Sequence, residues 1–134
     1  MNETDLKQRT KEFALRILKL VDTLPNRISA RVLANQIARS GTSVAANYRS
    51  ACRGRSKAEF ISKLGIAEEE ADETELWLEL IEEHGLVSAG KLAALRQEAG
   101  ELTAIIASSR ITAARNASGG IRQSKIGNPK SQIP

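Results

Sequence analysis

The chain has 134 residues, enough for one domain with a modest core, and its 41% of apolar residues is ordinary for a globular protein. The formal net charge is +4, but the segment after Asn116 supplies three bases and no acid, so the rest of the chain is nearly neutral and no uniformly basic surface is expected. The single cysteine, Cys52, excludes an intramolecular disulfide, and no run reaches the roughly 18 apolar residues of a membrane helix. With a polar N-terminus as well, we expect a cytoplasmic protein without a membrane partner.

Two helical patterns occupy the first half of the chain. Apolar residues recur every three or four positions up to residue 23, with Thr4 or Asp5 as the cap, and a turn follows at Pro25. A second stripe starts near Ser29 and stays in phase through Gly41 to about residue 51. This continuity favours one long helix over two short helices with a break, although glycine costs roughly 1 kcal/mol relative to alanine. So small a residue within an apolar stripe allows close approach of another helix.

A third helix is predicted from Ser56, which caps it, with Glu59 as the capping-box partner three residues later. Apolar residues spaced alternately by four and three over residues 60–81 are typical of a bundle seam. Gly85 is expected to end this helix in the left-handed conformation. The only histidine, His84, stands beside it and is interpreted as a residue that caps the helix or compensates its dipole.

A fourth helix is predicted after Ser88, and its apolar stripe fades near Asn116. The remaining residues, 117–134, are rich in Gly, Ser and Pro, and we expect them to form a disordered basic tail. Strand alternation is absent from the sequence. Four helices with short links predict an all-α fold, an antiparallel up-down-up-down four-helix bundle over residues 1–116.

Charge is sharply segregated in the middle of the chain. The segment from Arg39 to Phe60 holds five basic residues and no acid before Glu59. Four of its cations form a candidate nucleic-acid-binding patch, because phosphate contacts need only fixed positive charges. They are Arg49, Arg53, Arg55 and Lys57. A solvated basic bundle end is the alternative, and the patch has no aromatic platform for stacking the bases of single strands.

The third helix carries the opposite charge, with nine acids between Glu68 and Glu83. Five of them share one helical stripe: Glu68, Asp72, Glu75, Glu79 and Glu82. Like charges at this spacing repel by a few tenths of a kcal/mol, so the stripe is either solvated or compensated by another helix or another subunit. Trp77 lies beside further apolar residues, which indicates either a wider core or a subunit interface. The candidate interface residues are Glu68, Asp72, Glu75, Trp77 and Glu79.

Catalytic and metal-binding patterns are weak. Cys52 has no base beside it that would make it a nucleophile, so we interpret it as a quiet, packed thiol. Neither a phosphate-binding GxxxxGK[ST] loop nor a GxSxG elbow is present. A di-iron bundle uses Glu-x-x-His pairs, whereas His84 has Ile81 three residues before it. We therefore expect no enzymatic activity, no metal and no cofactor.

The stretch ARSGTSVAANYRSACRGRSKAEFISKLGIAEEEADETELWLELI resembles the signature of the bacterial four-helix-bundle proteins related to the 23S ribosomal RNA intervening-sequence protein. That pattern contains an arginine, a small-Ser/Thr-Ser-Val/Ile run, an Ala-Asn pair, a Ser-x-x-x-Phe helix start and a Glu/Thr-rich third helix. The resemblance covers residues 12–116 and is strongest over residues 37–81. Many relatives have Ala-Glu-Gly after the asparagine, whereas Asn47 is followed here by YRSACR, which makes this region more basic.

The resemblance implies a left-handed antiparallel bundle that assembles into a homopentamer, with an accessory role in nucleic-acid binding and no enzymatic activity. The chain is also similar to accessory proteins of diversity-generating retroelements, which implies RNA and a reverse transcriptase as partners. In a pentamer, the basic second helix of one copy could face the acidic third helix of the next. The sequence thus predicts a homo-oligomer that associates with RNA or DNA. The alternative is a protein-interaction scaffold that uses the acidic face of the third helix and binds no nucleic acid.

Overall fold

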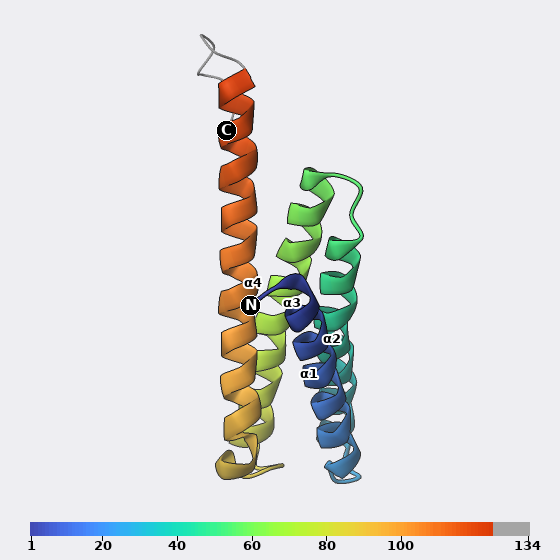
Figure 1. Cartoon of the computed structure of the whole chain (residues 1–134). Coiled ribbons are helices and arrows are strands. Elements are labelled where there is room, and N and C mark those ends of the chain that lie inside the picture. The colour runs from blue at the N-terminus through green and yellow to red at the C-terminus, as the bar shows by residue number, and fades with distance from the viewer. Residues whose placement is uncertain (125–134) are drawn as a thin grey trace.

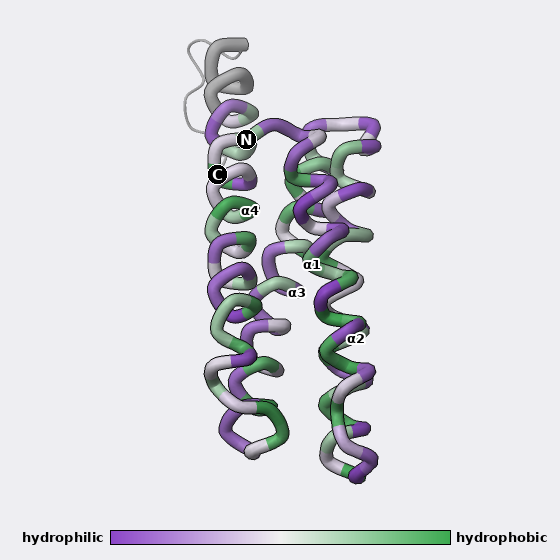
Figure 2. Tube along the Cα trace, turned by 60° about the horizontal axis from the view of Figure 1, so that its bottom comes forward, coloured by the Kyte–Doolittle hydropathy of each residue, from purple (hydrophilic) through white to green (hydrophobic). Residues whose placement is uncertain are grey.

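Four helices form the fold, which a computed structural model describes for the backbone of residues 1–124 and the side chains of residues 1–118. They are α1 (Glu3–Thr23), α2 (Ile28–Cys52), α3 (Lys57–Glu83) and α4 (Ala89–Ser124). Each helix runs antiparallel to the one before it (Figure 1). Apolar and polar residues are interleaved along every helix, as expected where one side faces a core and the other faces solvent (Figure 2). The predicted four-helix bundle is confirmed.

The helices do not share their contacts equally. α3 packs extensively on both α2 and α4, and α1 packs mainly on α2 and meets α4 at few positions. Arg9 joins α1 to α4 through a two-pronged ion pair with Glu98, in which Nε and Nη2 each lie 2.7 Å from a carboxylate oxygen. Its Nη2 also lies 2.6 Å from Glu101 Oε1. These bonds, the one to Glu98 above all, raise the pKa of the Arg9 guanidinium.

The core is built from Leu, Ile, Val and Ala with Phe13 and Tyr48, as the low aromatic content requires. Gly41 lies inside a continuous α2, so the prediction of one long helix is confirmed. An added Cβ at this position would meet Ile17 Cγ2 of α1 at 2.9 Å. The missing side chain therefore lets α1 and α2 approach closely, as the stripe predicted.

The start of α1 differs from the prediction, whereas the start and the end of α3 agree with it. Asn2, rather than Thr4 or Asp5, caps α1: its side chain accepts a hydrogen bond from the Asp5 N–H at 2.8 Å. Ser56 caps α3 as predicted, and Gly85 has the predicted positive φ of 79°.

The predicted end of the fourth helix near Asn116 is wrong, because α4 continues to Ser124. It extends past the end of α3 at which the α2–α3 link lies (Figure 1). Residues 117–124, which we assigned to a disordered tail, are therefore helical. The rest of that tail, residues 125–134, lies outside the described residues. Composition suggested a loop because Gly119 and Gly120 weaken a helix, but the long α4 propagates through them.

Candidate nucleic-acid interface

Basic side chains from three helices gather around the C-terminal half of α2. A hollow of about 390 Å³ between α1 and α2 is lined by Lys7, Lys11, Ala45, Ala46 and Arg49. A second hollow, of about 540 Å³, lies between α2, the α2–α3 link and α3. It is lined by Ala46, Arg49, Ser50, Arg53, Arg55, Glu59 and Lys63. Because both hollows share Ala46 and Arg49, they form one continuous surface. We call its six cations, Lys7, Lys11, Arg49, Arg53, Arg55 and Lys63, the basic face.

Most cations of the basic face have no carboxylate partner. Within residues 1–118 no ion pair involves Lys11, Lys63 or the three arginines of this face, and Lys7 approaches Glu3 only to 4.0 Å. Elsewhere, by contrast, Arg9, Arg39, Arg96 and Arg110 are each ion-paired with glutamates. Exposed cations outside this face, such as Arg16 and Arg27, are also unpaired within residues 1–118. What distinguishes the basic face is that its six cations lie together around two joined hollows, which concentrates positive charge there.

Hydrogen bonds donated by its backbone amides hold the α2–α3 link in place. The N–H groups of Arg53 and Gly54 donate to the carbonyls of Ser50 and Ala51 at 3.1 and 3.0 Å. The Arg55 N–H donates to Glu59 Oε1 at 2.8 Å. The predicted capping box is therefore incomplete. The Glu59 carboxylate accepts a hydrogen bond from the Arg55 N–H and not from the Ser56 N–H. These bonds fix the backbone from which Arg53 and Arg55 project.

The predicted binding residues are brought together with one exception. Arg49, Arg53 and Arg55 line the second hollow, whereas Lys57 is exposed at the start of α3 and lines neither hollow. Sequence reasoning missed the lysines from α1 and Lys63 from α3. Lys7 and Lys11 are one turn apart on the same face of α1, and this spacing was a usable signal.

Below the basic face lies a thiol that is poorly suited to nucleophilic chemistry. Cys52 is half-buried, and its pKa is raised, first by burial and also by its contact with Glu3. Burial likewise raises the pKa of Tyr48, which is only 5% exposed. His84 lies far along the chain at the other end of α2, with Nε2 3.1 Å from Ser29 Oγ. Within the described residues, no group of three or more His, Cys, Asp or Glu side chains is placed to hold a metal ion.

The acidic stripe of α3 faces α4. Arg110 Nε lies 2.6 Å from Glu68 Oε1, and Arg96 lies 2.8 Å from Glu82 and 3.8 Å from Glu79. Another helix of the same chain therefore compensates much of this charge, one of the alternatives that the spacing left open. No second copy is required for that compensation.

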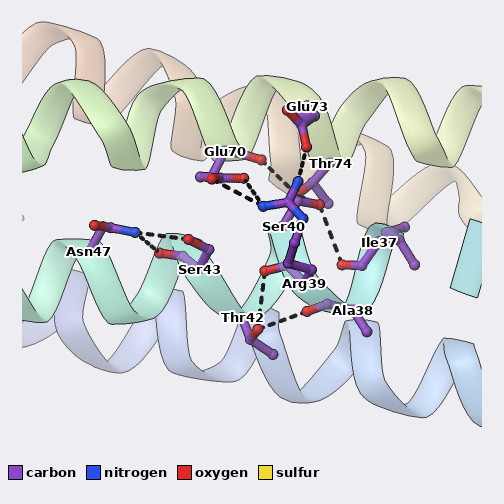
Figure 3. Close-up of polar contacts among 10 residues, drawn as sticks. All are labelled: Ile37, Ala38, Arg39, Ser40, Thr42, Ser43, Asn47, Glu70, Glu73 and Thr74. Carbon is purple, nitrogen blue, oxygen red and sulfur yellow. Dashed lines mark hydrogen bonds and ion pairs between the residues drawn. The ribbon is translucent and has the colours of Figure 1, made fainter. Parts of the chain in front are cut away.

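On its other side α3 meets α2 through polar groups. Arg39 pairs with Glu70 and Glu73, and the buried hydroxyls of Ser40 and Thr74 lie 2.8 Å apart (Figure 3). These contacts fix the rotation of α2 against α3, and with it the direction in which the basic face points.

The remaining candidate interface residues have mixed surroundings. Asp72 is exposed, and no ion pair within residues 1–118 involves it. Trp77 packs against the core, and its indole Nε1 is buried with no hydrogen-bond partner. Near it, at the end of the bundle away from the basic face, an apolar hollow of about 580 Å³ is lined by Ser29, Val32, Leu33, Leu80, Glu83 and His84. Ile28, Val32, Leu76 and Leu80 are exposed around it.

These observations define the class of protein: an all-α four-helix bundle with one strongly basic face and no membrane-crossing helix in its described part. The sequence pattern of the family described as 23S rRNA-intervening sequence protein matches residues 2–108, and the chain belongs to this family. The resemblance found in the sequence is thereby confirmed.

A solved relative supports the same assignment. It is a protein with unknown function from the S23 ribosomal protein family of Bacteroides thetaiotaomicron, and it is 37% identical to this chain. The two superpose with a TM-score of 0.77 over 82% of this chain and 98% of that chain. No curated protein matches the sequence.

Proposed function

We propose that this protein is a non-enzymatic homo-oligomer that binds RNA or DNA through the phosphate groups, with the basic face as its binding surface. One observation carries the proposal: six cations from three helices and the α2–α3 link line two joined hollows, and within residues 1–118 only Lys7 among them has an ion pair, with Glu3 at 4.0 Å. Fixed cations of this kind are what phosphate contacts require.

The proposed assembly is a pentamer, as the family resemblance implies. Its support in this chain is the apolar hollow between α2 and α3, whose lining residues Val32 and Leu80 are 55% and 38% exposed. Apolar side chains grouped in this way favour burial against another surface. Because this end of the bundle is distant from the basic face, assembly there would leave the basic faces of all copies accessible.

Charge reversal tests the binding surface. A variant with Arg49, Arg53 and Arg55 replaced by Glu should lose nucleic-acid binding while its helical content, followed by circular dichroism, stays unchanged. Six phosphate contacts give a plot of log Kobs against log salt concentration a slope of about −5. Any residual binding of the variant should have a shallower slope, about −2 or closer to zero. In the matched control, Glu replaces Arg16, Lys19 and Lys91, which are exposed and lie outside both hollows. This control should bind as the wild type does. Unchanged affinity in the first variant would remove this surface as the site.

A protein-interaction scaffold is the second candidate function, in which the apolar hollow binds a partner protein instead of another copy of this chain. A reverse transcriptase is the proposed partner if the chain acts as the retroelement accessory proteins do. Substitution of Val32 and Leu80 by Asp should then abolish partner capture while nucleic-acid binding persists. Capture that survives these substitutions would argue against this hollow as the docking site.

A further inference from the structure

The two hollows of the basic face adjoin along the exposed side of α2, where Ala46 and Arg49 line both. Each hollow has its own cations on the far wall: Lys7 and Lys11 from α1, and Lys63 from α3. The part of α2 between them carries the small residues Ala45, Ala46 and Ser50, with Arg49 as the only long side chain common to both hollows. A ridge of small residues lets another surface approach the α2 backbone closely.

The spacing of these cations suits two phosphate strands. The cations on the two far walls, those of α1 and Lys63 of α3, are separated by α2, which is about 10 Å thick with its side chains. The grooves of a B-form duplex are about 6 and 12 Å wide, with a phosphate row on each side. In the first row, Lys7 and Lys11 are four residues apart, a rise of about 6 Å, and Arg49, on the ridge between the rows, is four residues from Arg53. The cations thus form two rows, each on its own side of a central ridge.

The surroundings are poor for a single strand. Proteins that bind single strands stack the bases on aromatic side chains, worth about 1–3 kcal/mol per base. Among the side chains that the structure describes, residues 1–118, none that lines either hollow is aromatic. Tyr48, on the same part of α2, is only 5% exposed, and Phe13 of α1 is fully buried.

The ridge carries few groups that read base edges: among residues 1–118 its long side chain is Arg49, which can read guanine. The nearest side-chain amide, that of Asn47, donates from Nδ2 to the Ser43 carbonyl at 2.9 Å and lies 2.8 Å from Ser43 Oγ (Figure 3). Among residues 1–118, neither hollow is lined by an Asn or Gln side chain, the usual reader of adenine. Apart from Arg49, recognition by this surface therefore depends on phosphate positions.

We propose that the basic face binds a double helix, with the α2 ridge over one groove and the phosphates of the two strands in the two hollows. This inference rests on the proposed nucleic-acid binding and adds which form of nucleic acid is bound. The α1 lysines serve one strand, and Arg53 with Lys63 serves the other.

The test measures fluorescence anisotropy with labelled oligonucleotides of equal phosphate number: a single strand, a DNA duplex of unrelated sequence and an RNA duplex. We expect either duplex to bind about tenfold tighter than the single strand, or more. The two duplex arms then show whether DNA or RNA is preferred. Since a duplex has a higher charge density than a single strand, the preference alone is not sufficient.

Variants that remove two cations from one hollow at a time supply the decisive comparison. Lys7→Ala with Lys11→Ala removes cations from the first hollow, and Arg53→Ala with Lys63→Ala removes them from the second. Each variant should reduce duplex affinity and lower the duplex-to-single-strand ratio to about threefold or less, with the duplex salt slope weaker by about 2. The control pair Arg16→Ala with Lys19→Ala should leave the ratio unchanged.

The possible outcomes separate the two ideas. Equal or tighter binding of the single strand overturns the duplex inference and leaves the proposed function standing. A ratio that falls for only one of the two hollows overturns the two-strand arrangement. Absence of binding to all three oligonucleotides overturns both the inference and the proposed function.

Discussion

Replacement of Gly41 by Ala gives a sensitive test of how α1 and α2 pack. Two effects oppose each other. Alanine is favoured over glycine inside a helix by about 1 kcal/mol. The new Cβ, however, would lie 2.9, 3.0 and 3.1 Å from Cγ2, Cγ1 and Cβ of Ile17. Ile17 is fully buried and β-branched, so it cannot turn away, and overpacking of this kind costs about 1–3 kcal/mol.

We expect steric overlap to prevail and Gly41→Ala to destabilise the fold by about 1 kcal/mol. Urea unfolding at fixed protein concentration, followed by circular dichroism, measures this change. Gly65→Ala and Gly100→Ala are matched controls, because an added Cβ there meets its nearest neighbours at 3.7 and 3.4 Å. Both controls should be stabilising by about 0.5–1 kcal/mol.

The same substitution in an Ile17→Ala variant tests whether contact with Ile17 causes the destabilisation. Ile17→Ala removes the two γ-carbons that Gly41→Ala would strike, although the substitution itself costs about 2–5 kcal/mol. In that background Gly41→Ala should cost at least about 1 kcal/mol less than in the wild type, since helix propensity remains and only the Cβ of residue 17, at 3.1 Å, is still close. If Gly41→Ala stabilises the wild type as much as Gly65→Ala does, the close approach of α1 and α2 is refuted.

Three further predictions concern charges and the thiol. Arg9→Ala should lower the unfolding free energy by about 1 kcal/mol. Gln97 and Arg9 lower the pKa of Glu101 in the folded state, so the stability that this contact contributes is present at neutral pH and is lost as the pH falls below the ordinary pKa of 4.5. Unfolding midpoints measured across this pH range should therefore fall less steeply in Arg9→Ala than in the wild type. Identical pH profiles would contradict the contact between Arg9 and Glu101. Glu59→Gln keeps an acceptor for the Arg55 N–H but removes the only acid lining the second hollow, so salt-titrated binding should tighten by about fivefold, and weaker binding would contradict its role. Cys52 should react with a disulfide reagent at least about tenfold more slowly in the native protein than in urea, because burial raises its pKa; equal rates would contradict its packing.

The ion pairs explain how a nearly neutral bundle can present a basic surface. Glutamates of α3 bind Arg39 on one side and Arg96 and Arg110 on the other. Each of these pairs consumes a positive charge at a helix–helix contact. The basic face lies beyond their reach, where α2 carries no acid and α3 contributes only Glu59. Net charge alone would therefore understate the local positive potential.

The length of α4 shows where composition misleads. Its apolar stripe ends near Asn116, and the following Gly and Ser residues are ordinary loop formers. The helix continues nevertheless to Ser124, beyond the start of α3. Propagation from a long, packed helix costs much less than starting a new one, so two glycines do not stop it.

The sequence by itself determined the four helices, the unbroken α2 and the end of α3 at Gly85. Each depends on local spacing or on one residue's backbone preference, which can be read along the chain. It also determined that Arg49, Arg53 and Arg55 belong together, since they are close in sequence.

Only the tertiary structure decided which charges are paired. Whether Glu68 meets Arg110 or solvent depends on the rotation of α3 and α4 about their axes, which packing sets. The same rotation brings Lys7 and Lys11 of α1 beside Arg49, more than thirty residues away along the chain. A candidate site made of one segment thus became a surface built from three helices, because the antiparallel register of α1, α2 and α3 aligns their basic residues at one end.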